Sequence, residues 1–256
     1  MAALTDTHCH LYLDAFRQDI RAVMERAREA GVTRFFLPAI SSAETADLLA
    51  LEAAYPQQCF AMMGLHPCSV NAGYREELEA VKNWLAQRSF AAVGEIGLDF
   101  YWDKTYIREQ YEAFETQIEW ALGAGLPVVI HSREAMQECI DMIRKYSVRG
   151  LRGIFHCFGG SFQQARDIID AGFYLGIGGV LTYKKSGLAE VLKDIPLQHL
   201  VLETDAPYLT PVPFRGKRNE SSYLTYVAAE LARVKNTSLE EVGAVTSNNA
   251  EKIFGR

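Results

Sequence analysis

The chain has 256 residues, of which 49% are hydrophobic and 23% charged, and its formal net charge at pH 7 is −6. This length suits one domain, residues 1–256, with a substantial core, and the apolar content excludes disordered and collagen-like classes. A protein that grips long duplexes is usually basic, so the acidic balance disfavours that class but allows a short nucleic-acid end.

The five cysteines are an odd number and form no C-x-x-C pair, which favours free thiols over a disulfide framework or a zinc finger. No stretch approaches the roughly 18 consecutive apolar residues of a membrane span, and no basic segment leads into an apolar one near residue 1. We therefore expect a cytoplasmic protein without a membrane segment, and no obligate protein partner.

Eight short apolar runs alternate with amphipathic stretches along the chain. The runs, predicted as strands, are residues 4–11, 33–40, 59–67, 90–100, 126–133, 153–158, 173–179 and 200–207. Helical periodicity is clear at residues 19–31, 74–87, 107–125 and 161–172. Gly31, Gly125 and Gly172 close three of these stretches, as glycine commonly does at helix ends.

This alternation predicts parallel strands joined by right-handed crossovers. Eight such units in about 250 residues is the dimension of a closed (β/α)₈ TIM barrel, whose active site lies at the C-terminal ends of its strands. An open doubly wound sheet is the alternative. It predicts fewer strands and usually a Gly-rich loop after the first, which is absent here.

Four of the six histidines and two carboxylates on the predicted strands stand out as candidate metal ligands. His8 and His10 alternate in the first one, so both should enter the barrel mouth while Cys9 faces the helices. Hydrogen-bonded core histidines are the usual alternative, but they do not explain why so many such residues end separate strands. The residues expected to converge at the barrel mouth are His8, His10, Glu95, His131, His156 and Asp205.

This set exceeds the three protein ligands of a mononuclear catalytic zinc site, so we expect two divalent ions. Glu95 is the expected bridge, because a carboxylate has two oxygens that can each bind a cation. One ion would take His8, His10, Glu95 and Asp205, and the other Glu95, His131 and His156. Imidazoles favour a transition metal in at least one position, and the choice among Mg²⁺, Mn²⁺ and Zn²⁺ stays open.

Seven short motifs resemble those of the TatD-type metal-dependent hydrolases, a branch of the amidohydrolase superfamily. In family order between residues 6 and 220 they are DTHCHL, GLHP, VGEIGLDFY, VIHSRE, FHCFGG, LETDAPYL and RGKRNE. The resemblance implies a two-metal phosphodiesterase, often described as a deoxyribonuclease acting on DNA ends, with the six residues above at the metal positions. Where the family commonly has Asn-Glu-Pro, this chain has Asn219-Glu220-Ser221, and we expect a less rigid loop there.

The expected chemistry is attack by a hydroxide activated between the two ions, whose binding lowers the pKa of water from about 15.7 to about 7. Asp205 is the candidate general base, and a role as ligand only is the alternative. Glu95 would take part as the shared ligand. Glu203, two residues before Asp205, should support a metal ligand, and a buried salt bridge without effect on the metal is its alternative.

Three further residues are candidates for substrate binding. His66 ends a strand and can contact a phosphate, or be a satisfied structural histidine. Arg133 should begin a helix at the mouth, where it can clamp an anion or merely pair with Glu134 or another surface acid. Arg215 opens the basic loop RGKRNE, which we expect to contact a phosphate chain, with a solvated surface as the alternative. Rim aromatics that can stack a base or merely pack are Phe100, Tyr101, Trp102, Phe158 and Tyr208.

The sequence thus predicts a divalent-metal-dependent phosphodiesterase, an exonuclease acting on nucleic-acid ends and DNA in particular. The same ligands would also suit hydrolysis of a small-molecule ester, amide or lactone, and the sequence does not exclude a carbonyl substrate. A barrel that binds metal or a partner without catalysis is a third alternative, disfavoured because every expected ligand is present.

Overall fold

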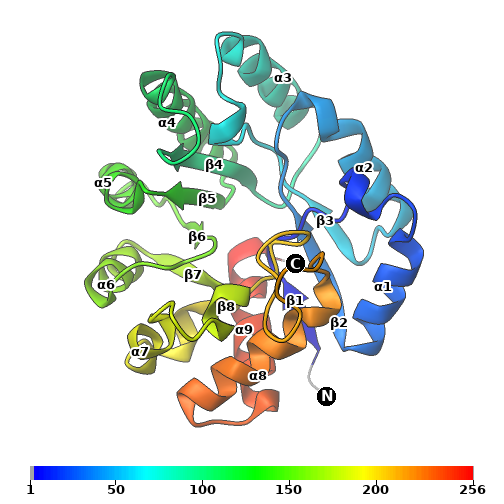
Figure 1. Ribbon diagram of the computed structural model, residues 1–256. Helices are drawn as coiled ribbons and strands as arrows, with labels where there is room; N and C mark the ends of the chain where they lie inside the picture. The colour runs from blue at the N-terminus through cyan, green and yellow to red at the C-terminus, as the bar shows by residue number, and fades with distance from the viewer. Residues whose placement is uncertain (1–2, 256) are drawn as a thin grey trace.

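Eight parallel strands form the centre of the protein in a computed structural model that describes residues 3–255. Helices surround the strands in Figure 1. Each of the eight predicted runs contains one strand: β1 Leu4–Asp6, β2 Val32–Leu37, β3 Cys59–Ala61, β4 Val93–Asp99, β5 Val128–Arg133, β6 Gly153–Phe155, β7 Phe173–Ile177 and β8 Leu200–Leu202. β2 begins one residue before its predicted run.

The helices lie between successive strands and after the last. They are α1 Ile20–Glu29, α2 Thr45–Ala54, α3 Tyr74–Gln87, α4 Ile107–Ala124, α5 Met136–Ser147, α6 Phe162–Asp170, α7 Leu188–Lys193, α8 Leu224–Lys235 and α9 Leu239–Phe254. The four predicted helical stretches are confirmed as α1, α3, α4 and α6. Gly31, Gly125 and Gly172 follow three of these helices with positive φ angles, as predicted. Among these helices, none is both long and apolar enough to cross a bilayer.

Backbone hydrogen bonds close the strand ring at the two places where one sheet gives way to the other. Strands β1 to β3 pair in one sheet and β4 to β8 in a second. A parallel bridge between Met63 and Val93 connects the segment after β3 to β4. On the other side, the Thr7 amide donates to the Leu202 carbonyl over 3.0 Å. The strands therefore follow one another around a closed (β/α)₈ barrel, as predicted, and the open sheet is excluded.

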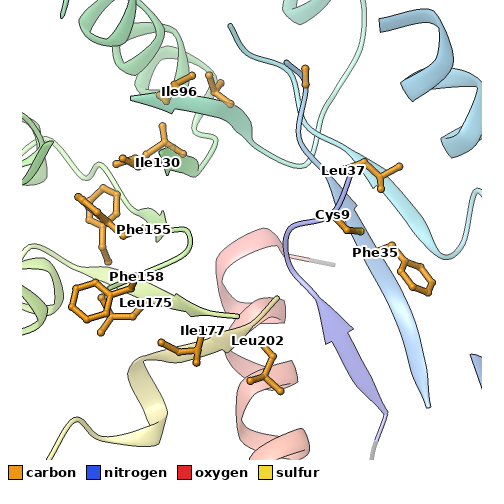
Figure 2. Close-up of a cluster of buried hydrophobic side chains, with 14 of the residues drawn as sticks. Cys9, Phe35, Leu37, Ile96, Ile130, Phe155, Phe158, Leu175, Ile177 and Leu202 are labelled. Carbon is orange, nitrogen blue, oxygen red and sulfur yellow. The ribbon is translucent and has the colours of Figure 1, made fainter. Parts of the chain in front are cut away.

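Alternating side chains of the strands divide the core into two layers. Phe35 and Leu37 of β2 point outward into the large core beneath the helices, whereas Phe36 between them belongs to a separate inner cluster. Figure 2 shows outward-facing side chains from several strands, including Ile130, Leu175 and Leu202. The period of two in a strand explains this division and leaves the inward positions near the strand ends free for polar groups.

Helix α9 covers the N-terminal end of the barrel. Its residues Ala250, Ile253 and Phe254 pack with the inner cluster, and the Phe254 ring stacks on Phe36 with a centroid distance of 3.8 Å. The Asn249 amide donates to two carbonyls of the chain around β8, which fixes the helix there. In Figure 1, α9 (red) lies behind the strands near β1 and β8. The barrel interior is therefore filled by apolar side chains from this end, and the candidate metal ligands lie at the opposite end.

The first strand is shorter than predicted, and this corrects the placement of two histidines. β1 ends at Asp6, so His8 and His10 lie beyond the strand. Both are nevertheless held against the segment that follows β8: the Asp205 amide donates to the His8 carbonyl over 2.9 Å, and the His10 amide donates to the Ala206 carbonyl over 2.7 Å. These two hydrogen bonds join the segment after β1 to the segment after β8. They keep both imidazoles at the mouth of the barrel.

Candidate metal centre

The six candidate ligands converge at the C-terminal ends of the strands. Glu95 lies in β4 and His131 in β5, and the other four follow β1, β6 and β8. They lie at a pocket of about 750 Å³ whose wall includes His10, Glu95, His131, His156 and Asp205. Residues up to 197 positions apart in sequence therefore meet at one place, as the barrel topology predicted.

Glu95 faces two separate groups of donors with its two oxygens. Its Oε2 atom lies 3.1 Å from His8 Nε2 and 3.7 Å from His10 Nε2. The same two nitrogens lie 3.6 and 3.5 Å from one oxygen of Asp205. The His8 and His10 nitrogens are 3.3 Å apart. One oxygen of Glu95 thus completes a compact set of donor atoms with the two N-terminal histidines and Asp205.

The other oxygen of Glu95 serves the second group. Oε1 lies 2.9 Å from His131 Nδ1 and 3.0 Å from His156 Nε2. The ligand atoms of Glu95, His131 and His156 are close enough to share one ion, as are those of His8, His10 and Glu95. Glu95 is common to both sets, which is the geometry of a bridging carboxylate.

The strand register explains why His131 lies between two carboxylates. His131 pairs with Gly97 of the neighbouring β4, and Glu95 and Asp99 lie two residues on either side of that glycine. Its Nδ1 contacts Glu95, and its Nε2 lies 2.8 Å from Asp99 Oδ2. A side chain at Gly97 is excluded, because a Cβ atom would lie 2.1 Å from the His131 carbonyl.

A tyrosine fixes the orientation of His10. The Tyr12 hydroxyl donates to the Pro38 carbonyl over 2.6 Å and lies 3.1 Å from His10 Nδ1. Since its single proton is used on Pro38, the hydroxyl accepts from His10 Nδ1–H. His10 Nε2 is then left with a free lone pair directed at Glu95 and Asp205, which is the form in which imidazole binds a metal.

Glu203 lies next to one histidine of the second group, His156. Its Oε1 atom accepts a hydrogen bond from the Cys157 amide and lies 3.5 Å from His156 Nδ1. Space for this buried carboxylate comes from Gly176, where a Cβ atom would lie 2.1 Å from Glu203 Oε2. The structure therefore places Glu203 behind His156, on the side away from Glu95.

The pKa values in the site are set by burial and by nearby charges, which act in opposite directions on several groups. Burial raises the pKa of the Glu95 carboxyl, but His156, His66 and His8 outweigh it, so that pKa lies well below its ordinary value. Burial lowers the pKa of His156, yet Glu95 and Glu203 raise it well above the usual range. For His8, burial and the neighbouring His156 lower the pKa, which keeps this imidazole neutral. The Glu95 carboxyl thus stays ionised and attracts positive charge.

The donor set fits divalent cations. Four imidazoles and two ionised carboxylates are nitrogen and oxygen ligands of the kind that transition metals bind. His8 Nδ1 is buried without a hydrogen-bond partner among residues 3–255, and His156 Nδ1 faces Glu203 at 3.5 Å, so each ring can keep a proton on Nδ1 and offer Nε2 as a ligand atom. A cation would supply the positive charge that the buried carboxylates require.

Asp205 is held in an unusual backbone conformation at the site. Its φ angle of 56° lies in the left-handed region, which aspartate tolerates better than most residues. Burial raises the pKa of its carboxyl, but the contact with His10 and the charges of nearby histidines lower it overall. Asp205 therefore presents an ionised carboxylate to the same nitrogen atoms that face Glu95.

His66 lies at the pocket, but its ring is oriented differently from the candidate ligands. Its Nδ1 accepts a hydrogen bond from the Cys68 amide over 3.0 Å, so a neutral His66 carries its proton on Nε2. That nitrogen lies 3.4 Å from Glu95 Oε1. His66 is therefore arranged as a hydrogen-bond donor beside the shared carboxylate.

Arg133 differs from its prediction in two respects. It is the last residue of β5 and not the start of a helix, because β5 continues past His131 for two more residues. The expected alternative pairing with Glu134 is wrong, since that carboxylate lies 3.8 Å from Lys104. The Arg133 guanidinium instead lies over the Tyr101 ring, 4.0 Å from its centroid, and lines the pocket.

The basic loop of residues 215–220 is only partly available for an external phosphate. The Arg218 guanidinium donates to both carboxylate oxygens of Asp19 at 2.8 and 2.7 Å, so this residue ties the loop to the start of α1. Glu220 accepts two hydrogen bonds from Arg26. Arg215 lies over the Tyr183 ring, with 4.4 Å from its guanidinium carbon to the centroid. Within this loop, the prediction of phosphate contact thus rests on Arg215 and Lys217.

Ser221, which stands where the family commonly has proline, is buried and hydrogen-bonded. Its hydroxyl donates to Asp6 over 2.6 Å, and the Thr204 hydroxyl donates to the same oxygen over 2.6 Å. These bonds connect β1, the end of β8 and the loop after it. Ser221 thus makes a hydrogen bond to Asp6 that proline could not make. The packing at this point therefore does not indicate the less rigid loop that we expected.

Three residues beside the site were missed by the sequence reasoning: Asp99, Tyr12 and Asp6. Asp99 had a detectable pattern, because it lies four residues after Glu95 in one predicted strand and so faces the same side. Tyr12 and Asp6 act through contacts with Pro38 and Ser221, which lie 26 and 215 residues away in sequence. No local pattern indicates such pairs.

Comparisons with known proteins show relatives along almost the whole chain. The model of the family described as TatD related DNase matches residues 5–255. An uncharacterised metal-dependent hydrolase of Bacillus subtilis, YabD, is 37% identical over 252 residues and is covered over 98% of both chains. A protein of Edwardsiella piscicida named 3'-5' ssDNA/RNA exonuclease TatD is 33% identical over 257 residues, with 98% of this chain and 99% of that protein covered.

The fold agrees with a solved structure as well. The crystal structure of the TatD homologue YjjV from Escherichia coli superposes with a TM-score of 0.93 at 32% sequence identity, covering 99% of this chain and 98% of that one. Family match, sequence relatives and fold thus point the same way along almost the whole chain. The chain belongs to the TatD family of metal-dependent hydrolases.

Proposed function

We propose that the protein is a divalent-metal-dependent phosphodiesterase that removes nucleotides from DNA ends, with two metal ions in its active site. The observation that carries the proposal is the division of Glu95 between two donor groups. Glu95 Oε2 lies 3.1 Å from His8 Nε2, and Glu95 Oε1 lies 2.9 Å from His131 Nδ1. In each pair the two atoms are close enough to bind the same cation. A single-ion site would need only one of these groups.

The proposed ligands are assigned by the donor atoms that face each other. His8, His10 and Asp205 would hold one ion and His131 and His156 the other, with Glu95 shared. When bound, two such cations lower the pKa of water toward about 7 and stabilise both the attacking and the leaving oxygen of a phosphodiester. This arrangement suits phosphorus chemistry, in which negative charge on the attacking and leaving oxygens must be stabilised in the transition state.

Asp205 is the proposed general base. Its carboxylate is ionised, it lies at the pocket wall, and its oxygen is directed at the nitrogens of the first ligand group. It can therefore accept a proton at Oδ1 or Oδ2 and pass it to the leaving oxygen. His66 and Arg133 are the proposed substrate contacts, because His66 Nε2 and the Arg133 guanidinium both present donors to the pocket. Arg215 would contact a phosphate farther along the strand.

Two observations support cleavage at the end of a strand over binding along a duplex: the net charge of this chain and the name of one relative. The net charge of −6 disfavours extensive phosphate contacts, and a pocket of about 750 Å³ takes one or two nucleotides more readily than a duplex. The relative from Edwardsiella piscicida is named as an exonuclease acting on ssDNA and RNA.

The test is digestion of end-labelled single- and double-stranded DNA by protein that has been stripped with a chelator and then reloaded with Mg²⁺, Mn²⁺ or Zn²⁺. We expect no cleavage after chelation and recovery on reloading, with removal of terminal nucleotides. His131→Ala should lose cleavage together with one bound ion, because it removes a ligand of one group only. His199→Ala is the matched control, since His199 precedes β8 and lies outside the six-residue site.

Full activity of the His131→Ala variant with unchanged metal content would contradict the proposal. Binding of a single ion to the wild-type protein on titration would contradict its two-metal form. Parallel assays on a nitrophenyl ester test the other candidate, hydrolysis of a small-molecule ester, amide or lactone. We place this second because the unpaired guanidinium of Arg133 at the pocket suits a phosphate better than a neutral carbonyl group.

A cytoplasmic location remains part of the proposal. All five cysteines are free thiols in the structure, and three of them are buried. Free thiols of this kind are typical of a reducing compartment. Fractionation of cells that express the tagged full chain would test this placement.

A further inference from the structure

An exposed tryptophan stands at the rim of the pocket. Trp102 leaves 68% of its surface in solvent, whereas Trp84 and Trp120 are partly buried against the core. The Trp102 side chain lines the pocket, and the preceding Tyr101 is 48% exposed. Aromatic side chains usually bury most of their area, so two exposed ones in sequence beside a reaction site indicate a surface for a flat apolar ligand.

A cation lies across these two rings. The Arg133 guanidinium carbon is 4.0 Å from the Tyr101 centroid and 5.3 Å from that of Trp102. Within residues 3–255, no carboxylate lies within ion-pair distance of Arg133, although its side chain lines the pocket. The arginine is thus held by the rings while its charge stays available, which suits an anionic group bound next to an aromatic one.

Asp99 fixes the position of this platform relative to the candidate metal ligands. Its Oδ1 atom accepts hydrogen bonds from the amides of Tyr101 and Trp102 at 2.9 and 3.0 Å. Its Oδ2 atom contacts His131 Nε2 at 2.8 Å. One carboxylate therefore orients a candidate ligand and the chain segment that carries both rings, so a group resting on Trp102 lies at a defined place beside the reaction site.

We propose that Trp102 and Arg133 form a subsite for one unpaired nucleotide at the end of a nucleic-acid strand. The base stacks on the Trp102 indole, and the Arg133 guanidinium contacts the phosphate attached to that nucleotide. This inference rests on the proposed function, and it names the substrate form: a single-stranded end, whose terminal base has a free face and can turn away from its neighbours. A base paired in a blunt duplex must first leave its partner, which weakens binding.

Binding can be measured without catalysis. In the presence of a chelator, titration of the full-length protein with oligothymidylate should quench tryptophan fluorescence, and Trp102→Phe should abolish most of the quenching because Trp84 and Trp120 lie in helices away from the pocket. By anisotropy of a labelled oligonucleotide, Trp102→Ala should weaken binding about 5- to 100-fold. Tyr226→Ala is the control, since Tyr226 is an exposed aromatic on α8 that does not line the pocket.

Activity gives a second, matched measurement. With metal-loaded enzyme, Trp102→Ala should lower kcat/KM on a normal single-stranded end by about the same factor, mainly through KM. On a strand whose terminal nucleotide lacks its base, wild type and Trp102→Ala should be equal, because the stacking partner is missing from the substrate. Arg133→Gln should weaken binding of both substrates equally and reduce the salt dependence by about one ion, as expected of a phosphate contact.

The outcomes separate this inference from the proposed function. If wild type digests DNA and Trp102→Ala keeps wild-type kcat/KM on normal ends, the stacking subsite is overturned and the nuclease stands. If the oligonucleotide quenches Trp102 and no metal restores cleavage, the subsite stands and the nuclease is overturned. Absence of both binding and cleavage overturns both. Equal cleavage of blunt duplex and single-stranded ends would also contradict the subsite.

Discussion

The hydroxyl of Tyr12 offers a sharp test of how the protein prepares its metal ligands. Tyr12→Phe removes one oxygen and keeps the ring, which is buried with only 7% of its surface exposed. In the wild-type protein this oxygen accepts from His10 Nδ1 and donates to the Pro38 carbonyl. Without it, His10 loses the partner that selects the tautomer with a free Nε2 lone pair, and the neutral ring can place its proton on either nitrogen.

Two effects of different size are expected. Loss of a hydrogen-bond partner behind a ligating histidine typically lowers metal affinity about 10- to 100-fold. The buried Pro38 carbonyl and His10 Nδ1 also lose a partner, which costs about 1–3 kcal/mol of unfolding free energy. For a chain of this length that corresponds to a fall in Tm of roughly 2–10 °C. The ring itself leaves no cavity, so the fold is kept.

The assay is titration of metal-free protein with Zn²⁺ in competition with a chromophoric chelator, alongside a thermal melt in the absence of metal. Tyr74→Phe is the matched control: the Tyr74 hydroxyl donates to Glu112 over 2.6 Å on the outer face, away from the pocket. The control should keep wild-type metal affinity. If Tyr12→Phe also bound Zn²⁺ with wild-type affinity at both sites, the argument that Tyr12 selects the His10 tautomer would be refuted.

Two further predictions concern stability. Gly176→Ala places a Cβ atom 2.1 Å from Glu203 Oε2, so urea unfolding should show a loss of about 1–3 kcal/mol, and an unchanged midpoint would contradict the packing argument. Burial raises the pKa of Glu220, but the hydrogen bonds from Arg26 outweigh it and lower the pKa below its ordinary value of 4.5. The unfolded chain therefore takes up this proton first, and stability present above pH 4.5 is lost as the pH falls through the folded-state pKa. In thermal melts between pH 7 and pH 3, Glu220→Gln should lose less Tm on acidification than the wild-type protein. If Tm falls equally in both proteins, the stabilising role of the Arg26–Glu220 pair is contradicted.

The sequence predicts much of the fold because its strongest patterns are local. Each apolar run is short and bounded, and its period of two survives in the structure, as the outward Phe35 and inward Phe36 show. The end of β1 at Asp6 was not predictable in this way. The residues after it keep a strand-like pattern, but their partners are the amide of Asp205 and the carbonyl of Ala206, which only the closed ring brings near.

The same limit applies to the site. Its six candidate ligands could be predicted as a group, because a parallel barrel brings all strand ends to one face. Their orientation could not, since it depends on contacts such as Tyr12 with Pro38 and Glu203 with the Cys157 amide. The placement of Arg133 could not be predicted for a similar reason: its partners are ring faces, and no charge pattern in the sequence indicates a cation that rests on Tyr101.

The packing of α9 into the N-terminal end of the barrel determines how a ligand can enter and leave the pocket. With Phe36 and Phe254 stacked inside the ring, a strand that enters at the mouth meets a floor and cannot be threaded through. If the protein shortens nucleic-acid strands as we propose, the released nucleotide and the remaining strand must leave by the opening through which the strand entered. For the proposed exonuclease, a pocket closed at one end favours dissociation of the strand after each cleavage over processive degradation.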